Sequence, residues 1–291
     1  MDKLQKERLK MLADLITEYQ KLSFVIANIG CRPNEDGESE PFEIILEYFP
    51  GSEVIGFELE KELCEKLNKE SQNGFKFFHQ ALGLKNERRR LYNTIDPRCS
   101  SLYEPNEKLL SKYQALEMMH LKNVSEIDTV SLDYFCSKNK IEKIDFIKID
   151  IQGAELDVFK GAKNILKNTL CIISEVEFVP FYIKQPLFGD VYNFLIKEDF
   201  MLIKFLGFGG RFMKPIVLNN QAFDSHSQHL WSDVFFIRNI ESIKQLEDQK
   251  ILKLSFFAFL YQNVDIAFFF LSSYDFRHGT NLKKRFLDIF N

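Results

Sequence analysis

The 291-residue chain lacks the features that define several large classes of protein. A Phe-rich segment, 251–271, includes Lys253 and Asp265, which are costly inside a bilayer, so we expect no transmembrane segment. The net charge of -4 gives no overall cationic field, which argues against a nucleic acid as the main partner. Residues 1–10 alternate charged and apolar side chains without leading into an apolar core, so we expect no signal peptide and a cytoplasmic location.

Cysteine and glycine motifs are also sparse. The cysteines are widely scattered, with no C-x-x-C pair and no histidine at metal-ligand spacing, which indicates reduced thiols and no dedicated metal site. No G-x-G-x-x-G follows the first predicted strand, which argues against a nicotinamide cofactor. The cysteines are Cys31, Cys64, Cys99, Cys136 and Cys171.

The chain does have enough apolar residues for a sizeable core. Hydrophobic residues make up 45% and charged residues 27%, which is typical of one large globular domain with or without an appendage. We expect an amphipathic helix over 1–22, a main domain over 23–239 with an insertion at 81–128, and a helical extension over 240–291. The extension favours a packed helical hairpin or a homodimer interface, and contact with a membrane surface is the alternative.

The main domain opens with alternating strands and helices. Apolar runs predict strands over 23–30, 53–58 and 75–80, and helical periodicity predicts helices over 41–49 and 60–70. Short connections between them predict a parallel, doubly wound α/β sheet. The last two strands have no helix between them, so they predict an antiparallel hairpin at the sheet edge. The later elements are a helix over 129–139, a strand over 143–150, a helix over 156–167, a strand over 170–178, a helix over 188–197, and strands over 200–206 and 233–238.

The insertion 81–128 interrupts this rhythm. It contains a strand-like stretch at 90–95 but is otherwise irregular, and irregular excursions of this length are uncommon unless they are functional. We therefore expect a lid on the substrate side. Its basic run 88–90 is interpreted as a solvated loop, and contact with an anion is the alternative.

Chemistry is concentrated at predicted strand ends. Asp150 ends one strand, and Gln152 lies in the turn before the next helix, where open α/β sheets bind ligands. A small-residue turn at 27–30 allows close approach of a ligand, and Glu58 at the next strand end suits the two hydroxyls of a ribose. With a third strand end at Gln80 and Ala81 beside an adenine, the pattern predicts a nucleoside site.

A set of short motifs resembles the FkbM family of S-adenosylmethionine-dependent methyltransferases over about residues 23–238. Their order along the chain matches as well. The most specific part is the run 148–155 followed by 175–182. The motifs are 27–30 (Ala-Asn-Ile-Gly), 55–58 (Ile-Gly-Phe-Glu), 81–83 (Ala-Leu-Gly), 100–103 (Ser-Ser-Leu-Tyr), 129–133 (Thr-Val-Ser-Leu-Asp), 147–155 (Ile-Lys-Ile-Asp-Ile-Gln-Gly-Ala-Glu), 175–182 (Glu-Val-Glu-Phe-Val-Pro-Phe-Tyr) and 231–236 (Trp-Ser-Asp-Val-Phe-Phe).

This resemblance implies a class I methyltransferase fold. Such a fold has a Rossmann-like, doubly wound, seven-stranded sheet that is mostly parallel with an antiparallel last strand. It implies methyl transfer from S-adenosylmethionine to a hydroxyl of a carbohydrate or secondary metabolite, so the partner is a small-molecule or glycan acceptor. The implied cofactor residues are Asn28 and Gly30 at the methionine part, Glu58 at the ribose, Gln80 and Ala81 at the adenine, and Asp150 and Gln152 facing the sulfonium and the acceptor.

One departure leaves a second hypothesis open. The family usually has an acidic residue and a glycine where this chain has Phe24 and Ile26, so the alternative is a catalytically silent module for binding or assembly. The loop 31–40 is also longer than usual. Its acidic residues are interpreted as solvated and not ligating, and they are Glu35, Asp36, Glu38 and Glu40.

Methyl transfer to a hydroxyl needs a group that takes the proton. Asp150 is the first candidate, Glu175 or Glu177 the second, and His226 and His229 the third. Binding of a divalent cation by Asp150 and Glu177 is an alternative role. The acceptor walls are expected from 81–128 and 207–232, with Tyr103, Arg211 and Trp231 as candidate contacts.

Overall fold

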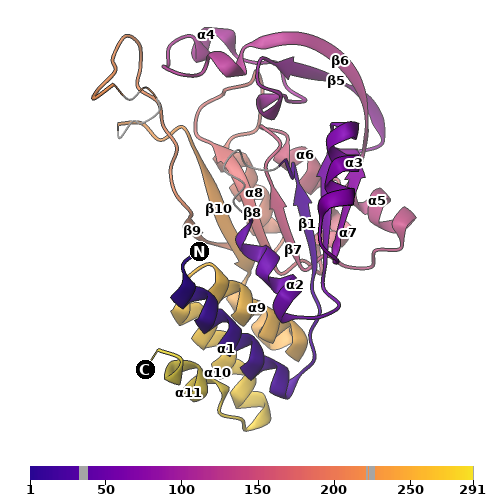
Figure 1. Cartoon of the computed structure of the whole chain (residues 1–291), viewed down its shortest axis with the longest axis vertical. Helices are drawn as coiled ribbons and strands as arrows, with labels where there is room; N and C mark the ends of the chain where they lie inside the picture. The colour runs from indigo at the N-terminus through magenta and orange to yellow at the C-terminus, as the bar shows by residue number, and fades with distance from the viewer. Residues whose placement is uncertain (33–38, 221, 223–226, 291) are drawn as a thin grey trace.

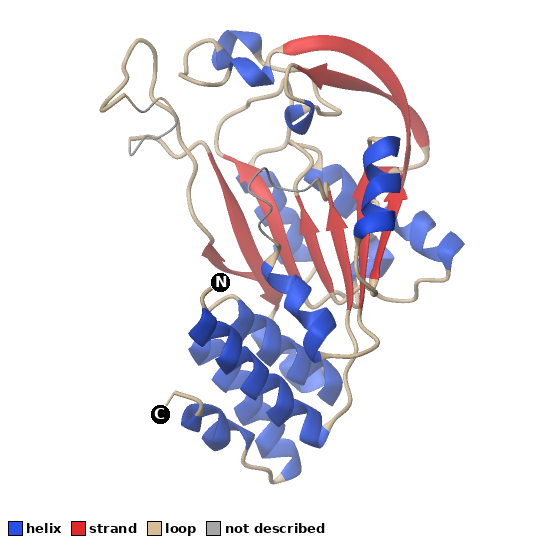
Figure 2. Ribbon diagram, viewed as in Figure 1, coloured by secondary structure: helices blue, strands red, loops and turns tan. Residues whose placement is uncertain are grey.

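The computed structural model describes residues 1–32, 39–220, 222 and 227–290. Its centre is a seven-stranded sheet whose parallel strands all point toward one end of the molecule (Figures 1 and 2). The last strand is antiparallel to both of its neighbours, which confirms the predicted mostly parallel sheet and its late hairpin. That strand is enclosed, so the strand before it forms the edge. In order across the sheet the strands are β3 (Phe75–His79), β2 (Glu53–Glu58), β1 (Val25–Ile29), β7 (Phe146–Ile149), β8 (Cys171–Glu177), β10 (Trp231–Arg238) and β9 (Phe200–Phe205).

Helices cover both faces of this sheet because its strands are apolar on both sides. In β1, Ile26 packs into one core cluster while Ala27 and Ile29 pack into the other. The first cluster includes α2 (Ile44–Tyr48), α9 (Asp248–Leu260) and the helices behind it, α1 (Lys3–Tyr19), α10 (Val264–His278) and α11 (Leu282–Asp288). The second includes α5 (Leu132–Asn139), α6 (Glu155–Lys160), α7 (Lys163–Leu166) and α8 (Phe188–Lys197), while α3 (Lys61–Glu70) lies along β2 and β3.

A buried ion pair fastens α9 to the amino-terminal end of the sheet. The Lys253 Nζ lies 2.8 Å from Asp145 Oδ2, and both side chains are no more than 3% exposed. The same carboxylate accepts the backbone N–H of Val25 at the start of β1. Burial lowers the pKa of Lys253, although Asp145 acts in the opposite direction. The C-terminal helices therefore share a core with the sheet, and a homodimer through them stays a prediction. In the part of the chain that the structure describes, no helix is both long and apolar enough to cross a membrane.

The insertion is more regular than the sequence predicted. It forms a three-stranded sheet in the order β4 (Ala81–Leu82), β6 (Leu121–Val130) and β5 (Glu87–Thr94). The helix α4 (Glu107–Leu110) lies in the connection between β5 and β6. The prediction of an irregular segment was wrong because β6 exposes side chains on both faces and so shows no alternation. The helix predicted from 129 begins only at Leu132, where the Ser131 Oγ accepts a hydrogen bond from the N–H of Tyr134.

The helix predicted over 156–167 is divided at Gly161 into α6 and α7. Glycine is required at this position because a Cβ would lie 2.5 Å from the carbonyl oxygen of Gly83. The segment 251–271 is divided between α9 and α10 at Gln262, whose φ of 59° is left-handed. A third apolar cluster joins α4 to the connections after β8 and β9, so the insertion rests on the carboxyl edge of the sheet.

Replacement of Lys253 by Met tests the buried ion pair. We expect the free energy of unfolding to fall by about 3–5 kcal/mol, because Asp145 would stay buried without its cation. The matched control is Lys10→Met, since Lys10 lies 2.7 Å from Asp14 on the exposed face of α1 and its loss should cost less than about 1 kcal/mol. Urea unfolding measures both, and equal costs would contradict the assignment.

Candidate active site

A cavity of about 470 Å³ opens at the carboxyl edge where β1, β2 and β7 end. The insertion closes its other side through residues of β5 and the segment 97–102. All the residues predicted to hold the cofactor line this cavity, except Asn28. They are Gly30, Glu58, Gln80, Ala81, Asp150 and Gln152.

Asn28 is absent from this lining because of the alternation of β1. Ile29 lines the cavity, and Asn28, as its neighbour in the strand, points to the opposite face. Its partners in the ladder are Gly56 and Lys148. Phe24 and Ile26 belong to that same face and are fully buried beneath α9, where the Phe24 ring lies 5.2 Å from that of Phe257. The departure from the family pattern at these positions therefore concerns packing of the C-terminal helices, and neither residue lines the cavity.

Gly30 allows β1 to meet β7 closely. Its φ is 80°, and a Cβ at this position would lie only 1.9 Å from the carbonyl oxygen of Asp150. The Gly30 N–H donates to the carbonyl of Phe57 at 3.2 Å. The backbone of this turn is thus exposed to the cavity with no side chain in the way.

The other two strand ends present polar groups to the cavity. Glu58 is 6% exposed, and its Oε1 accepts the N–H of Glu60 at 2.9 Å. Gln80 is bent back so that its Nε2 donates to the carbonyl of Ala81 at 3.1 Å. A carboxylate and an amide are therefore arranged along one wall, as hydrogen-bonding groups for a nucleoside require.

Asp150 is linked to Glu175 through the side chain of Gln152. The Gln152 Nε2 donates to Asp150 Oδ1 at 3.0 Å and to Glu175 Oε2 at 2.9 Å. Gln152 itself has a left-handed backbone, with a φ of 59°. On the other side, Lys148 Nζ lies 3.4 Å from Asp150 Oδ2.

The surroundings of Asp150 and Glu175 shift the pKa values of these two carboxyl groups in opposite directions. Burial favours a higher pKa for Asp150, but Lys148 and hydrogen bonds from Glu175 and Gln152 outweigh it and lower that pKa. Burial and the nearby charges of Asp150 and Glu177 raise the pKa of Glu175 well above its usual range. These opposite shifts favour the ionised form of Asp150 and the protonated form of Glu175.

Two more buried carboxyl groups support the turn after β7. Glu155 accepts the N–H of Ile151 at 2.8 Å and that of Gly153 at 3.3 Å, and burial raises its pKa to about 7. Glu177 is 3% exposed, and burial, followed by the charges of Glu155 and Asp150, raises its pKa well above the usual range. Glu177 does not line the cavity, so its predicted catalytic role has less geometric support than that of Asp150.

The structure describes only His229 and Glu40 among the remaining histidine and loop candidates. His229 is exposed, and its ring stacks on Phe208 with centroids 4.1 Å apart. His226 and the acidic residues of 33–38 fall outside the described residues. Glu40 is half-buried, and burial raises its pKa, so the prediction that it is solvated was wrong. Among the residues that the structure describes, no three His, Cys, Asp or Glu side chains are grouped to hold a metal ion.

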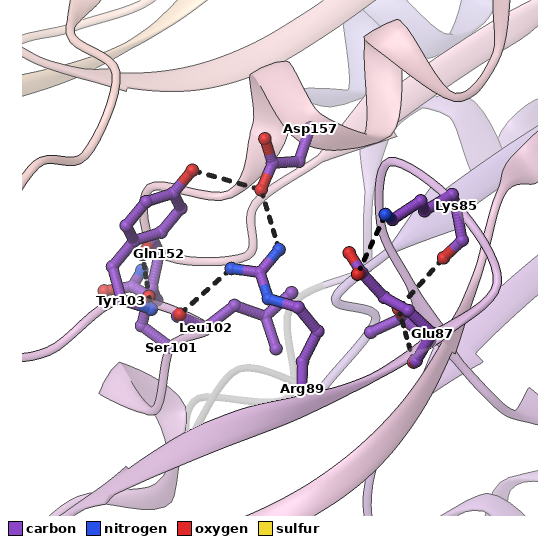
Figure 3. Close-up of polar contacts among 9 residues, drawn as sticks. Lys85, Glu87, Arg89, Ser101, Leu102, Tyr103, Gln152 and Asp157 are labelled. Carbon is purple, nitrogen blue, oxygen red and sulfur yellow. Dashed lines mark hydrogen bonds and ion pairs between the residues drawn. The ribbon is translucent and has the colours of Figure 1, made fainter.

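The sequence analysis missed the contacts that fasten the insertion to the turn after β7 (Figure 3). Arg89, the middle residue of the basic run, has its Nη1 3.1 Å from Asp157 Oδ2, and the Tyr103 hydroxyl donates to the same oxygen at 3.0 Å. The Ser101 Oγ donates to the carbonyl of Gln152 at 2.7 Å. Alternation along β5 directs Arg89 inward and its two neighbours outward. This direction could be predicted from the sequence only if the strand had been placed over 87–94.

Tyr182 makes the second connection to this turn. It is fully buried in the segment after β8, and its hydroxyl lies 2.7 Å from the carbonyl of Cys99 and 3.0 Å from Gln152 Oε1. The side-chain oxygen of Gln152 is thereby directed to Tyr182, and its nitrogen to the two carboxyl groups. The insertion, the segment after β8 and the turn after β7 are thus fixed to one another.

Comparison with known proteins assigns this arrangement to a family. A family model described as the methyltransferase FkbM domain matches residues 25–204. The chain belongs to this family. It is therefore a S-adenosylmethionine-dependent methyltransferase, as the motifs predicted. The FkbM match begins in β1 and ends in β9, so it includes the strand ends that line the cavity.

One curated relative is the 2-O-methyltransferase NoeI of Sinorhizobium fredii (strain NBRC 101917 / NGR234). It is 27% identical over 176 residues, which are 57% of this chain and 69% of NoeI. Among solved structures, a putative S-adenosylmethionine-dependent methyltransferase from Listeria monocytogenes aligns over 80% of this chain and 98% of its own, with 9% identity and a TM-score of 0.37. A chain of the fibrillarin/Nop5p complex aligns over 78% and 80%, with 15% identity and a TM-score of 0.36. The FkbM-family membership and the strand order together give the class I methyltransferase fold.

Gly30→Ala tests the close contact between β1 and β7. We expect a loss of about 2–5 kcal/mol in the free energy of unfolding, because the new methyl group meets a backbone oxygen and the backbone is left-handed. Gly189→Ala in α8 is the control, since nothing lies within 4 Å of its Cβ position, and it should stabilise the helix by up to about 1 kcal/mol. Thermal or urea unfolding measures the free energy of unfolding of both variants. An unchanged free energy in Gly30→Ala would contradict the close contact between β1 and β7.

Proposed function

We propose that this FkbM-family protein transfers a methyl group from S-adenosylmethionine to a hydroxyl of a sugar, a glycan or a similar polyhydroxylated small molecule. The observation that carries the proposal is the single cavity that joins the ends of β1, β2 and β7. Its volume of about 470 Å³ lies within the usual range of small-molecule sites.

The cavity residues suit the parts of this cofactor. Gly30 lines the cavity with backbone atoms alone, which suits the methionine part. Glu58 has a carboxylate oxygen suited to the ribose hydroxyls, and the adjacent Gln80 and Ala81 border the space proposed for the adenine. Asp150 and Gln152 lie where the sulfonium end would be, since they follow β7 beside Gly30.

The cofactor, when bound, supplies a methyl group that is already activated on a sulfonium. The residues of the chain then have two tasks, which are to align the acceptor hydroxyl and to take its proton. Asp150 suits both, because it is ionised and keeps 32% of its side chain exposed. Alignment supplies most of the acceleration, and a positioned base adds about 10²- to 10⁴-fold.

The proposal of a hydroxyl acceptor is supported by the relative NoeI, whose name is 2-O-methyltransferase. The acceptor walls are proposed from the insertion and the connection between β9 and β10. There, the Arg211 guanidinium lies 4.8 Å from the centre of the half-buried Trp231 ring, a flat surface that suits a sugar. The Tyr103 hydroxyl is engaged by Asp157, so Tyr103 is a weaker candidate for contact with the acceptor.

Glu58→Gln tests the ribose contact. We expect the affinity for S-adenosylmethionine, and for S-adenosylhomocysteine, to fall by about 10- to 100-fold, the cost of a hydrogen bond to a charged group. Glu62→Gln, on the exposed side of α3, removes the same charge and should change neither affinity. Isothermal titration calorimetry measures both. Failure of the unaltered protein to bind at millimolar concentrations would refute the cofactor assignment.

Asp150→Asn tests the base. With labelled S-adenosylmethionine and a panel of polyhydroxylated acceptors, we expect transfer to fall by about 10²- to 10⁴-fold while the side chain keeps its shape. The affinity for the cofactor should change much less than the rate. Transfer that is undiminished in Asp150→Asn would overturn this role. An unaltered protein that binds the cofactor but methylates none of the panel would favour the silent-module alternative.

A further inference from the structure

We propose that Lys148 is a positioning residue that makes the Asp150–Glu175 pair asymmetric, so that Asp150 is the ionised base and Glu175 holds the proton. This inference deepens the proposed function and rests on it for its catalytic meaning. Its structural basis is the arrangement of three side chains around one amide.

The first step concerns the distance between the two carboxyl groups. Both Asp150 Oδ1 and Glu175 Oε2 accept from the same Gln152 nitrogen, at 3.0 and 2.9 Å, so the two groups are held close together. Two carboxyl groups that share one site cannot both ionise without a large cost. One proton is therefore retained by the pair.

The second step concerns which group retains it. Lys148 Nζ lies 3.4 Å from Asp150 Oδ2, and its side chain is only 12% exposed. A cation next to one member of the pair favours ionisation of that member, which is Asp150. The charged and titratable groups that face this centre are Lys148 from β7, Glu175 and Glu177 from β8, Tyr182 after β8, Asp233 from β10, Glu155 from α6, Glu40 ahead of α2 and Cys99 of the insertion.

The reaction step balances with this assignment. The hydroxyl oxygen forms its bond to the methyl carbon, the carbon–sulfur bond breaks, and its electron pair returns to sulfur, which becomes a neutral thioether. The hydroxyl proton passes to Asp150. A methylated hydroxyl that still carries its proton is a strong acid, so even a carboxylate with a lowered pKa accepts that proton. Glu175 and Lys148 keep their protons throughout.

The test measures the free energy of unfolding by urea at pH 5 and at pH 8. In the unaltered protein Asp150 is ionised over this whole range, so it adds no pH dependence. In Lys148→Met the folded-state pKa of Asp150 is raised, so its stabilising contribution is present at low pH and lost as pH rises. We expect the destabilisation by Lys148→Met to grow between pH 5 and pH 8 by about tenfold in the unfolding equilibrium constant, which corresponds to one pKa unit.

Two controls isolate the interaction. In an Asp150→Asn background, the cost of Lys148→Met should grow less between pH 5 and pH 8, because only Asp233 and Glu40 then remain as strong titrating partners of Lys148. Lys85→Met removes a lysine at the same 3.4 Å from its carboxylate partner Glu87, but on the surface (Figure 3), and its effect should not change with pH. A destabilisation by Lys148→Met that is equal at both pH values, or that grows as much in Asp150→Asn as in the unaltered background, would overturn the proposal.

The variant Glu175→Gln gives a second test, which does not depend on whether Lys148→Met folds. A protonated Glu175 has a folded-state pKa above its unfolded value, so its contribution is present below the unfolded value and lost as pH rises. The ratio of the folding equilibrium constant of the variant to that of the unaltered protein should therefore rise by about tenfold or more from pH 5 to pH 8. An unchanged difference would refute the protonated state of Glu175. None of these measurements uses the cofactor, so their failure is distinct from a failure to bind S-adenosylmethionine.

Discussion

The hydrogen bonds of the Gln152 side chain determine the geometry of the proposed catalytic centre. The amide nitrogen binds Asp150 and Glu175, and the amide oxygen lies 3.0 Å from the Tyr182 hydroxyl. These contacts require a left-handed backbone at a residue that is not glycine, which costs about 1–2 kcal/mol. Glu155 holds the neighbouring N–H groups and Ser101 binds the Gln152 carbonyl, so the surrounding structure stabilises this conformation. Strain at one residue thereby aligns two carboxyl groups.

The C-terminal helices bury one face of the central sheet, away from the cavity. Phe24 and Ile26 pack under α9, and Lys253 binds Asp145 at the opposite end of the sheet from Asp150. Because of these contacts, one face of β1 and β7 belongs to a buried apolar core, while the cavity lies at the carboxyl edge beside the insertion. Ligand chemistry is thus confined to the strand ends, where backbone groups and carboxylates are accessible.

Features that depend on local sequence patterns could be predicted from the sequence. The direction of a side chain and the place of an exposed strand could not, because they depend on burial and on strand register. Glu58 ends one short apolar run and Asp150 follows another, and both runs are typical of buried strands, so their position at one edge was predictable. Asn28 does not line the cavity because neighbouring side chains of a strand point to opposite faces, and Ile29 takes the cavity side. Strand β6 was missed because both its faces are exposed, and with it the inward direction of Arg89. The need for glycine at position 161 depends on the backbone of Gly83, which is distant in sequence.

Charge accounts for the need for a lysine within a group of acids. Asp150, Glu155, Glu175 and Glu177 are largely enclosed, and burial alone would leave all of them neutral. A neutral Asp150 can donate a hydrogen bond to a hydroxyl, but it cannot take a proton from it. Lys148 is close enough to offset the burial of one carboxylate and shares its charge with Asp233 and Glu40. In the proposed reaction the sulfonium loses its positive charge as Asp150 loses its negative charge, so the enclosed centre has the same net charge before and after transfer. An enclosed site of low dielectric favours a reaction that is neutral overall, and one lysine is sufficient to prepare it.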